Sequence, residues 1–209
     1  MRWGRVEATG GFFLLVAWMN YWDSQGLVPM ALLACTLHEL GHWGMIRAVG
    51  GRVRLIRLTA VGAEMAVDRP LGYWQEGAAA LAGPGVNLLL ALVFCCWSWG
   101  RTFAGLNLAL AIFNLIPIGS LDGGRTLYCA LSLLTGPDWA RRMGETLDLI
   151  CAGTLLGMGV LLAGTVGNIT MLLAALWIIG MIFRGKSHHS PAIRTCHQGR
   201  KPVKLKVRL

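Results

Sequence analysis

A stretch of 20 residues from Leu27 to Ile46 is apolar enough for a membrane helix, yet it contains the pentapeptide His38-Glu39-Leu40-Gly41-His42. Outside the pentapeptide the stretch carries no charge. Two imidazoles and a carboxylate are costly within a bilayer unless they have partners. The segment therefore predicts a functional site inside a membrane helix.

The spacing of the two histidines favours a metal site. Residues four apart share one face of a helix, so His38 and His42 can offer two nitrogens to one zinc ion, with Glu39 beside them. The chain has five His and five Glu in 209 residues, and at these frequencies a chance match to the motif is expected roughly 0.003 times. The alternative, a polar patch on a buried helix, is less favoured because the three groups would need partners.

The composition, 55% hydrophobic and 14% charged with a mean hydropathy of +0.57, excludes an ordinary soluble domain. We expect an α-helical polytopic membrane protein with about six transmembrane helices. The expected helices are Ala8 to Trp22, Leu27 to Ile46, Gly77 to Gly100, Thr102 to Leu121, and two within Leu149 to Phe183, divided near Gly164 to Asn168. Several Trp residues near these ends predict interfacial belts: Trp3, Trp22, Trp74 and Trp99.

The basic residues predict the orientation. With six spans, 18 of the 19 Lys and Arg residues lie on one side and only Arg101 on the other, so both termini are expected in the cytoplasm. The net charge of +9 is then loop charge facing a lipid bilayer, and no nucleic-acid partner is expected. We expect residues 184–209 to form a basic cytoplasmic tail, whose three histidines have no expected role.

Gly51 to Val61, after the second span, alternates partly and is rich in branched residues, so it predicts a short β-like segment on the cytoplasmic side. A strand edge there could pair with an unwound substrate. The alternative is a plain hairpin that anchors the loop, and the sequence does not decide between the two.

A catalytic zinc ion usually has three protein ligands, so a third must come from elsewhere. Asp122 is the best placed acidic residue: Pro117 should end the fourth span, and Gly123 and Gly124 allow a tight turn. Under the predicted topology Asp122 and the His pair lie toward the same side. Asp122 could also cap the helix that begins near Gly123, and the two roles are compatible.

Three motifs in order resemble the site-2 protease family of intramembrane zinc metalloproteases, especially its compact bacterial branch related to the sporulation factor IV FB protease. The motifs are His38 to His42, Gly83-Pro84-Gly85-Val86-Asn87, and Asn114 to Gly124 ending in Leu-Asp-Gly-Gly. The resemblance covers roughly residues 8 to 183. It implies His38, His42 and Asp122 as ligands of one Zn2+ per chain, with Glu39 as the catalytic base. The family's regulatory nucleotide-binding or PDZ domains have no counterpart in the 26 residues after Phe183.

The expected activity is hydrolysis of a peptide bond in or near the transmembrane segment of a membrane-anchored protein. This would release a cytoplasmic fragment such as a transcription or sigma factor. Residues 1–183 would form the protease domain, in the bacterial cytoplasmic membrane, with the active site open to the cytoplasm and a regulatory membrane protein as a further expected partner. Asn87 or Asn114 could contact the oxyanion or the substrate, or could bond between helices.

Two other functions compete with proteolysis. A metal-ion transporter would use the same polar groups for transit, but the chain has one cluster and no clear internal repeat. A non-catalytic membrane-protein binder is disfavoured because Glu39 is present. These alternatives make different predictions for a Glu39 variant.

Overall fold

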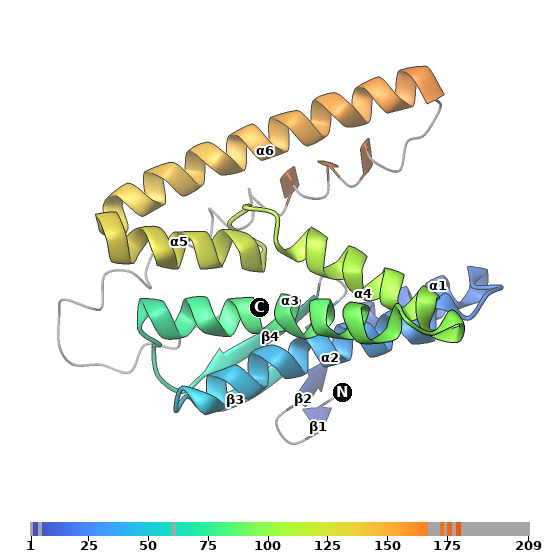
Figure 1. Ribbon diagram of the computed structural model, residues 1–209, viewed down its shortest axis with the longest axis horizontal. Helices are drawn as coiled ribbons and strands as arrows, with labels where there is room; N and C mark the ends of the chain where they lie inside the picture. Colours follow the sequence, from blue (N-terminus) through green and yellow to red (C-terminus); the bar gives the residue numbers. More distant parts are fainter. Residues whose placement is uncertain are drawn as a thin grey trace. The chain divides into compact units, whose positions relative to one another are not determined.

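The computed structural model describes residues 2–3, 6–59 and 62–166 and three short pieces, 172–173, 175–176 and 179–180. Helices dominate, with one small sheet (Figure 1). The chain divides into two compact units, the first ending at Ile116 and the second beginning at Pro117. Each unit is described by itself below.

Three helices form the body of the first unit: α2 (Leu27–Ala48), α3 (Tyr73–Phe94) and α4 (Arg101–Asn114). Helix α3 packs against both others (Figure 1). The contact of α2 with α3 is close because it uses small residues: a Cβ on Gly41 would lie 2.8 Å from the carbonyl oxygen of Ala82. Small residues at helix contacts are typical of membrane helices, because they let the backbones approach.

Helix α2 ends in a Schellman motif that turns the chain into the sheet. Gly50, with φ +82°, donates its N–H to Arg47 O at 3.0 Å, and Gly51 donates to Ile46 O at 2.7 Å. Glycine suits a left-handed C′ position, and the two bonds satisfy carbonyls that the helix leaves open. The turn fixes where the strand after α2 begins.

The sheet has four strands in the order β1 (Arg2–Trp3), β2 (Val6–Ala8), β3 (Val53–Thr59) and β4 (Gly62–Val67). Strand β3 pairs with β4 antiparallel and with β2 in parallel. A strand in this region was predicted from the sequence. The two N-terminal strands, β1 and β2, were not. Because β2 covers one side of β3, the edge strands of the sheet among the described residues are β1 and β4.

The sheet packs against the start of α3 and the end of α2. Buried Met65, Val53 and Val67 contact Ile46 and Ala79 in one apolar cluster. Ile46 lies one helical turn after His42, so burial of this cluster fixes the part of α2 that carries the His pair. The N-terminal strands are tied on by an ion pair, Arg57 Nη2 to Glu7 Oε2 at 2.9 Å.

Two helices form the described part of the second unit, α5 (Asp122–Thr135) and α6 (Pro137–Val166), and they pack on each other. A single residue, Gly136 with φ +91°, joins them. Side chains with a Cβ avoid this conformation, which is why a glycine stands between the helices.

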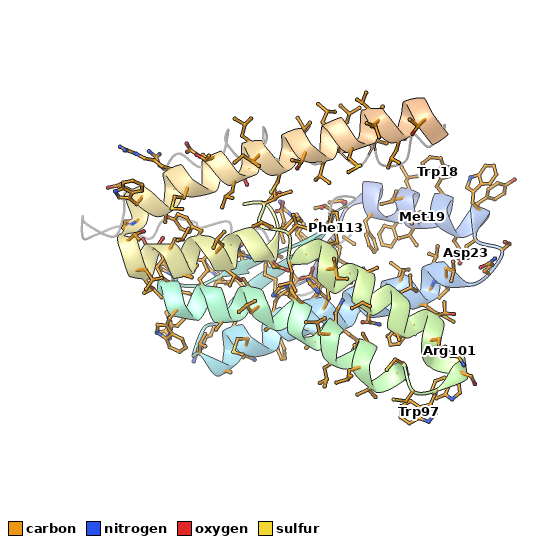
Figure 2. The ribbon with its side chains drawn as sticks, turned by 45° about the horizontal axis from the view of Figure 1, so that its top comes forward. Trp18, Met19, Asp23, Trp97, Arg101 and Phe113 are labelled. Atoms are coloured by element: carbon orange, nitrogen blue, oxygen red, sulfur yellow. The ribbon has the colours of Figure 1, made fainter. Side chains whose placement is uncertain are left out.

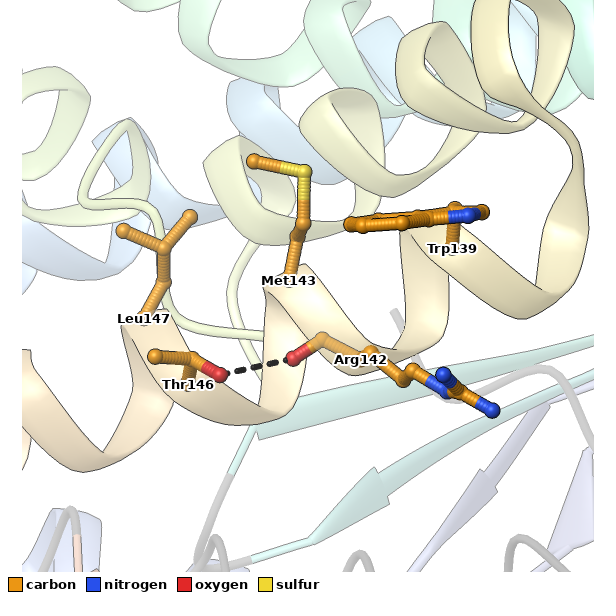
Figure 3. A pocket seen from close by; sticks show the side chains of 5 residues that line it. All are labelled: Trp139, Arg142, Met143, Thr146 and Leu147. Carbon is orange, nitrogen blue, oxygen red and sulfur yellow. Dashed lines mark hydrogen bonds between the residues drawn. The ribbon is translucent and has the colours of Figure 1, made fainter.

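One face of α6 has a shallow hollow of about 240 Å³ (Figure 3). Within it, the Thr146 hydroxyl donates to Arg142 O at 2.9 Å. The hydroxyl is thus satisfied inside its own helix, as is usual for threonine in membrane helices. The hollow is lined by Trp139, Arg142, Met143, Thr146 and Leu147.

Two helices among the described residues are long and apolar enough to cross a membrane, Tyr73–Phe94 and Pro137–Thr165. Six spans are therefore not confirmed. Helix α1 (Gly10–Trp22) has 13 residues and α4 has 14, or about 20 Å at 1.5 Å per residue, against a hydrocarbon core of about 30 Å. Helix α2 has 22 residues, but its imidazoles and carboxylate lower its mean hydropathy.

The break predicted near Gly164 to Asn168 lies partly outside the described residues. Its first part is helical, because α6 is continuous from Pro137 to Val166. The predicted basic tail, 184–209, lies wholly outside them. Of the four tryptophans predicted to lie at span ends, Trp22, Trp74 and Trp99 are exposed. Figure 2 shows Trp18 near the end of α1, and Trp97 with Arg101 at the turn between α3 and α4.

Asp23 stabilises the start of α2, whose N-cap, Gly26, has no side chain to do so. The Asp23 carboxylate accepts N–H bonds from Val28 at 2.7 Å and Leu27 at 2.9 Å. These bonds lower the pKa of Asp23 below its ordinary 3.8, with Val28 contributing most. The exposed carboxylate therefore satisfies donors that a helix start otherwise leaves to water.

We predict that Asp23→Ala lowers Tm by a few degrees at pH 7, because both acceptors are lost. A lowered pKa in the folded state means that the stabilisation is complete above 3.8 and fades as pH falls through the folded value. Thermal unfolding of the two proteins in detergent should therefore differ at pH 7, and the difference should shrink as the pH falls below 3.8. An equal Tm at pH 7 would contradict this account of the helix start.

Candidate metal centre

The His pair lies on one face of α2, as the spacing predicted. His38 and His42 are 5% and 1% exposed, and their Nε2 atoms are 3.0 Å apart. The rings meet edge to face, with centroids 4.6 Å apart. Two imidazole nitrogens thus converge on one point in a buried setting, which is the donor chemistry of a divalent metal site.

A backbone carbonyl on the neighbouring helix orients His42. Its Nδ1 lies 2.7 Å from Ala79 O, and because a carbonyl only accepts, Nδ1 carries the proton. In a neutral ring the lone pair is then on Nε2, the atom that faces His38. Metal-binding histidines usually hold their second nitrogen in this way, which fixes both tautomer and ring direction.

Gly83 on α3 provides the space for the two rings. A Cβ at this position would collide with His42 Nε2 and would lie 2.9 Å from His38 Cε1. A glycine that leaves room for two converging nitrogens fits a bound ion. The glycine thus allows α3 to approach the His pair closely.

Glu39 directly follows His38 on α2 and is half-buried. Its position in the helix turns it about 100° away from His38 while keeping it within the same turn. The Glu39 carboxylate therefore lies off the helix face that the two imidazoles share.

Asp122 lies in the second unit, where it is the first residue of α5 and is 4% exposed. The N-cap is Leu121, not Asp122, so the simple capping role is not the one observed. A carboxylate in the first turn is favoured by the helix dipole. Each of His38, His42 and Asp122 offers a buried oxygen or nitrogen that can ligate a metal.

Asn87 and Asn114 differ in how far their side-chain amides are hydrogen-bonded. Asn87 on α3 is fully buried, and neither atom of its amide has a hydrogen-bond partner among the described residues. Asn114 ends α4, is half-buried, and donates to Leu110 O in its own helix at 2.9 Å. Asn87 is thus the amide with unused capacity, whereas Asn114 is partly satisfied within α4.

Sequence reasoning missed two parts of this site, the Ala79 carbonyl and the role of Gly83. A backbone carbonyl has no signal in a sequence, because every residue has one. Gly83 was named as part of the second motif, but its contact with the imidazoles depends on how α3 packs on α2. The tail residues His188, His189 and His197 lie outside the described residues.

No protein-family model matches the chain. It is 37% identical over 125 residues to a candidate zinc metalloprotease of Synechocystis sp., 29% identical over 168 residues to a zinc metalloprotease of Methanocaldococcus jannaschii, and 31% identical over 144 residues to stage IV sporulation protein FB of Bacillus subtilis. These matches cover 53%, 73% and 62% of this chain. The chain covers 33%, 47% and 48% of the three relatives, which is less than half of each.

A solved structure of a site-2 protease from M. jannaschii has a similar fold, with a TM-score of 0.64 and 24% sequence identity over 94% of both chains. The chain therefore has the fold of a site-2 protease. Together with the sequence matches, this confirms the resemblance to the site-2 protease family that the three motifs predicted.

We predict that Gly83→Ala lowers zinc affinity at least about tenfold, because the added methyl group occupies space that the His42 ring needs. Gly85→Ala is the matched control, since a Cβ there meets nothing within 4 Å. Zinc per chain after competition with a chelator measures both. Equal affinity in the two variants would show that Gly83 does not shape the site.

Proposed function

We propose that this chain is an intramembrane zinc metalloprotease of the site-2 type. The observation that carries the proposal is the buried His38–His42 pair, with Nε2 atoms 3.0 Å apart, on a helix of a site-2 protease fold. The names of the sequence relatives support the same activity. Residues 1–183 would constitute the protease domain.

In this proposal His38, His42 and Asp122 hold one zinc ion. Two nitrogens and one carboxylate oxygen, with a position left for water, match the ligand set of zinc hydrolases. When bound, the ion lowers the pKa of a water molecule and polarises the peptide carbonyl. Ala79 O holds His42 in the tautomer that this role requires.

Glu39 is the proposed catalytic base. Its carboxylate takes a proton from the water that attacks the peptide carbonyl carbon, and it returns that proton to the leaving nitrogen as the C–N bond breaks. The proton is therefore conserved over the cycle and no other reagent is required. Asn87, whose amide has no hydrogen-bond partner in the described part of the chain, is better suited than Asn114 to donate a hydrogen bond to the oxyanion.

The substrate we propose is a single-span or otherwise membrane-anchored protein, cut in or near its transmembrane segment. The cut would release a cytoplasmic fragment such as a transcription or sigma factor. The enzyme would lie in the bacterial cytoplasmic membrane, with six crossings, cytoplasmic termini and a cytoplasmic opening. Because α1 and α4 are short, six crossings require a locally thinned bilayer or flanking residues that extend the spans.

Unwound substrate would bind along β4. The unpaired N–H and C=O groups on the open side of β4 suit strand addition, whereas β3 is enclosed by β2 and β4. Extended substrate would then present its backbone near the end of α2 that the sheet packs against. A regulatory membrane protein could act at the same edge.

Glu39→Gln separates proteolysis from the alternatives, metal transport and non-catalytic binding. The amide cannot accept the proton, so we expect cleavage of a coexpressed single-span substrate to fall at least about 100-fold while zinc content stays unchanged. A transporter would keep most of its flux in this variant. Cleavage at the native rate would contradict the assigned base, and a native chain without zinc would contradict the proposed function itself.

Single prolines at successive positions from Ala63 to Ala66 test the β4 edge. Neighbouring N–H groups of a strand point to opposite sides, so only alternate positions face a paired substrate. We expect cleavage to fall at these alternate positions while zinc content is retained. If no proline lowers cleavage without also lowering zinc content, the substrate does not pair with β4.

A further inference from the structure

The loop before Asp122 is held rigidly within the second unit. Ile118 is fully buried, and its carbonyl accepts an N–H bond from Leu121 at 2.8 Å. Gly124 on α5 touches the same loop so closely that a Cβ would collide with Ile118 O and would lie 2.6 Å from Gly119 N. The backbone leading to Asp122 therefore has little freedom on the α5 side.

On its other side the loop is bonded to α6 through a carboxylate. Gly119 donates its backbone N–H to Asp148 Oδ1 at 2.7 Å. A bond from an N–H to a charged oxygen is stronger than one between neutral groups, and this length is typical of it. A Cβ on Gly119 would lie 3.2 Å from Asp148 Oδ2, so glycine is what allows the close approach.

Asp148 is a charged residue within a helix that is otherwise apolar enough to cross a membrane. It directly precedes the apolar run that begins at Leu149, within the candidate span Pro137–Thr165. A carboxylate at such a position is costly unless it has a partner and a purpose. Thr146, two residues earlier, is satisfied within α6 (Figure 3), whereas Asp148 reaches out of its helix to the loop.

We propose that Asp148 is a positioning residue that holds the Gly119 loop, and through it Asp122, in the geometry that binds zinc. This inference rests on the proposed function, because it takes Asp122 as a zinc ligand. Asp148 itself touches neither metal nor substrate in this account. Its contribution is to remove freedom from the backbone three residues before the ligand, so that the carboxylate needs little ordering when the ion binds.

The test compares zinc affinity in the full-length native chain, Asp148→Ala, Asp148→Leu and Asp148→Asn. Loss of a direct hydrogen-bond partner of a metal ligand typically costs 10–100-fold in affinity. Asp148 acts through Gly119 and not on the ligand itself, so we expect the lower end, about tenfold, in the Ala and Leu variants. Asn still offers an oxygen to Gly119 N–H, so it should remain within about threefold of the native chain. Glu145→Ala, at an exposed site three residues earlier on α6, is the matched control and should not change affinity.

Co2+ substitution gives a second readout, because the visible spectrum of the ion reports ligand geometry. We expect the Ala and Leu spectra to differ from the native spectrum and the Asn spectrum to match it. Native affinity and a native spectrum in Ala and Leu would overturn the inference, as would an Asn variant as weak as Ala. A native chain that binds no zinc would instead refute the proposed function.

Hydrogen exchange of the native chain without metal tests the bond between Gly119 and Asp148 even if the Ala and Leu variants do not fold. The bond to Asp148 predicts slow exchange of the Gly119 amide, although the residue is exposed. Exchange at the rate of an unprotected amide would show that the loop is not held, and would overturn the inference.

Discussion

The contact between α2 and α3 at the His pair is the interaction on which the rest of the account depends. The Ala79 carbonyl fixes the proton of His42, and the missing side chain of Gly83 leaves room for both rings. The same Ala79 packs its methyl group into the cluster beneath the sheet. The turn of α3 around Ala79 therefore both orients His42 and contributes to the apolar cluster, so a shift of this turn would disturb both.

The two units carry different chemistry. The first holds two imidazoles and the proposed base on one turn-and-a-half of α2, so their spacing is set by helix geometry alone. The second supplies a carboxylate at the start of α5, where a loop bonded on two sides sets its position.

The local parts of this protein could be predicted from sequence. Helical spacing places His38 beside His42, Pro117 follows the end of α4, and the strand after α2 is found where branched residues alternate. Contacts between distant segments could not be predicted: the parallel pairing of β2 with β3, the Ala79 carbonyl and the Asp148 bond leave no pattern in the chain. The bounds of the predicted spans are less well predicted because apolar runs continue past helix ends, as in Thr102 to Leu121, where α4 stops at Asn114.

The central claim is that zinc is held by two imidazoles and a carboxylate. X-ray absorption at the zinc edge, on protein purified without chelator, tests it most directly. The account predicts one zinc per chain, surrounded by nitrogen and oxygen at about 2.0–2.2 Å, with the multiple-scattering signal of two imidazoles. Sulfur neighbours near about 2.3 Å, a single imidazole, or no stoichiometric zinc would contradict it.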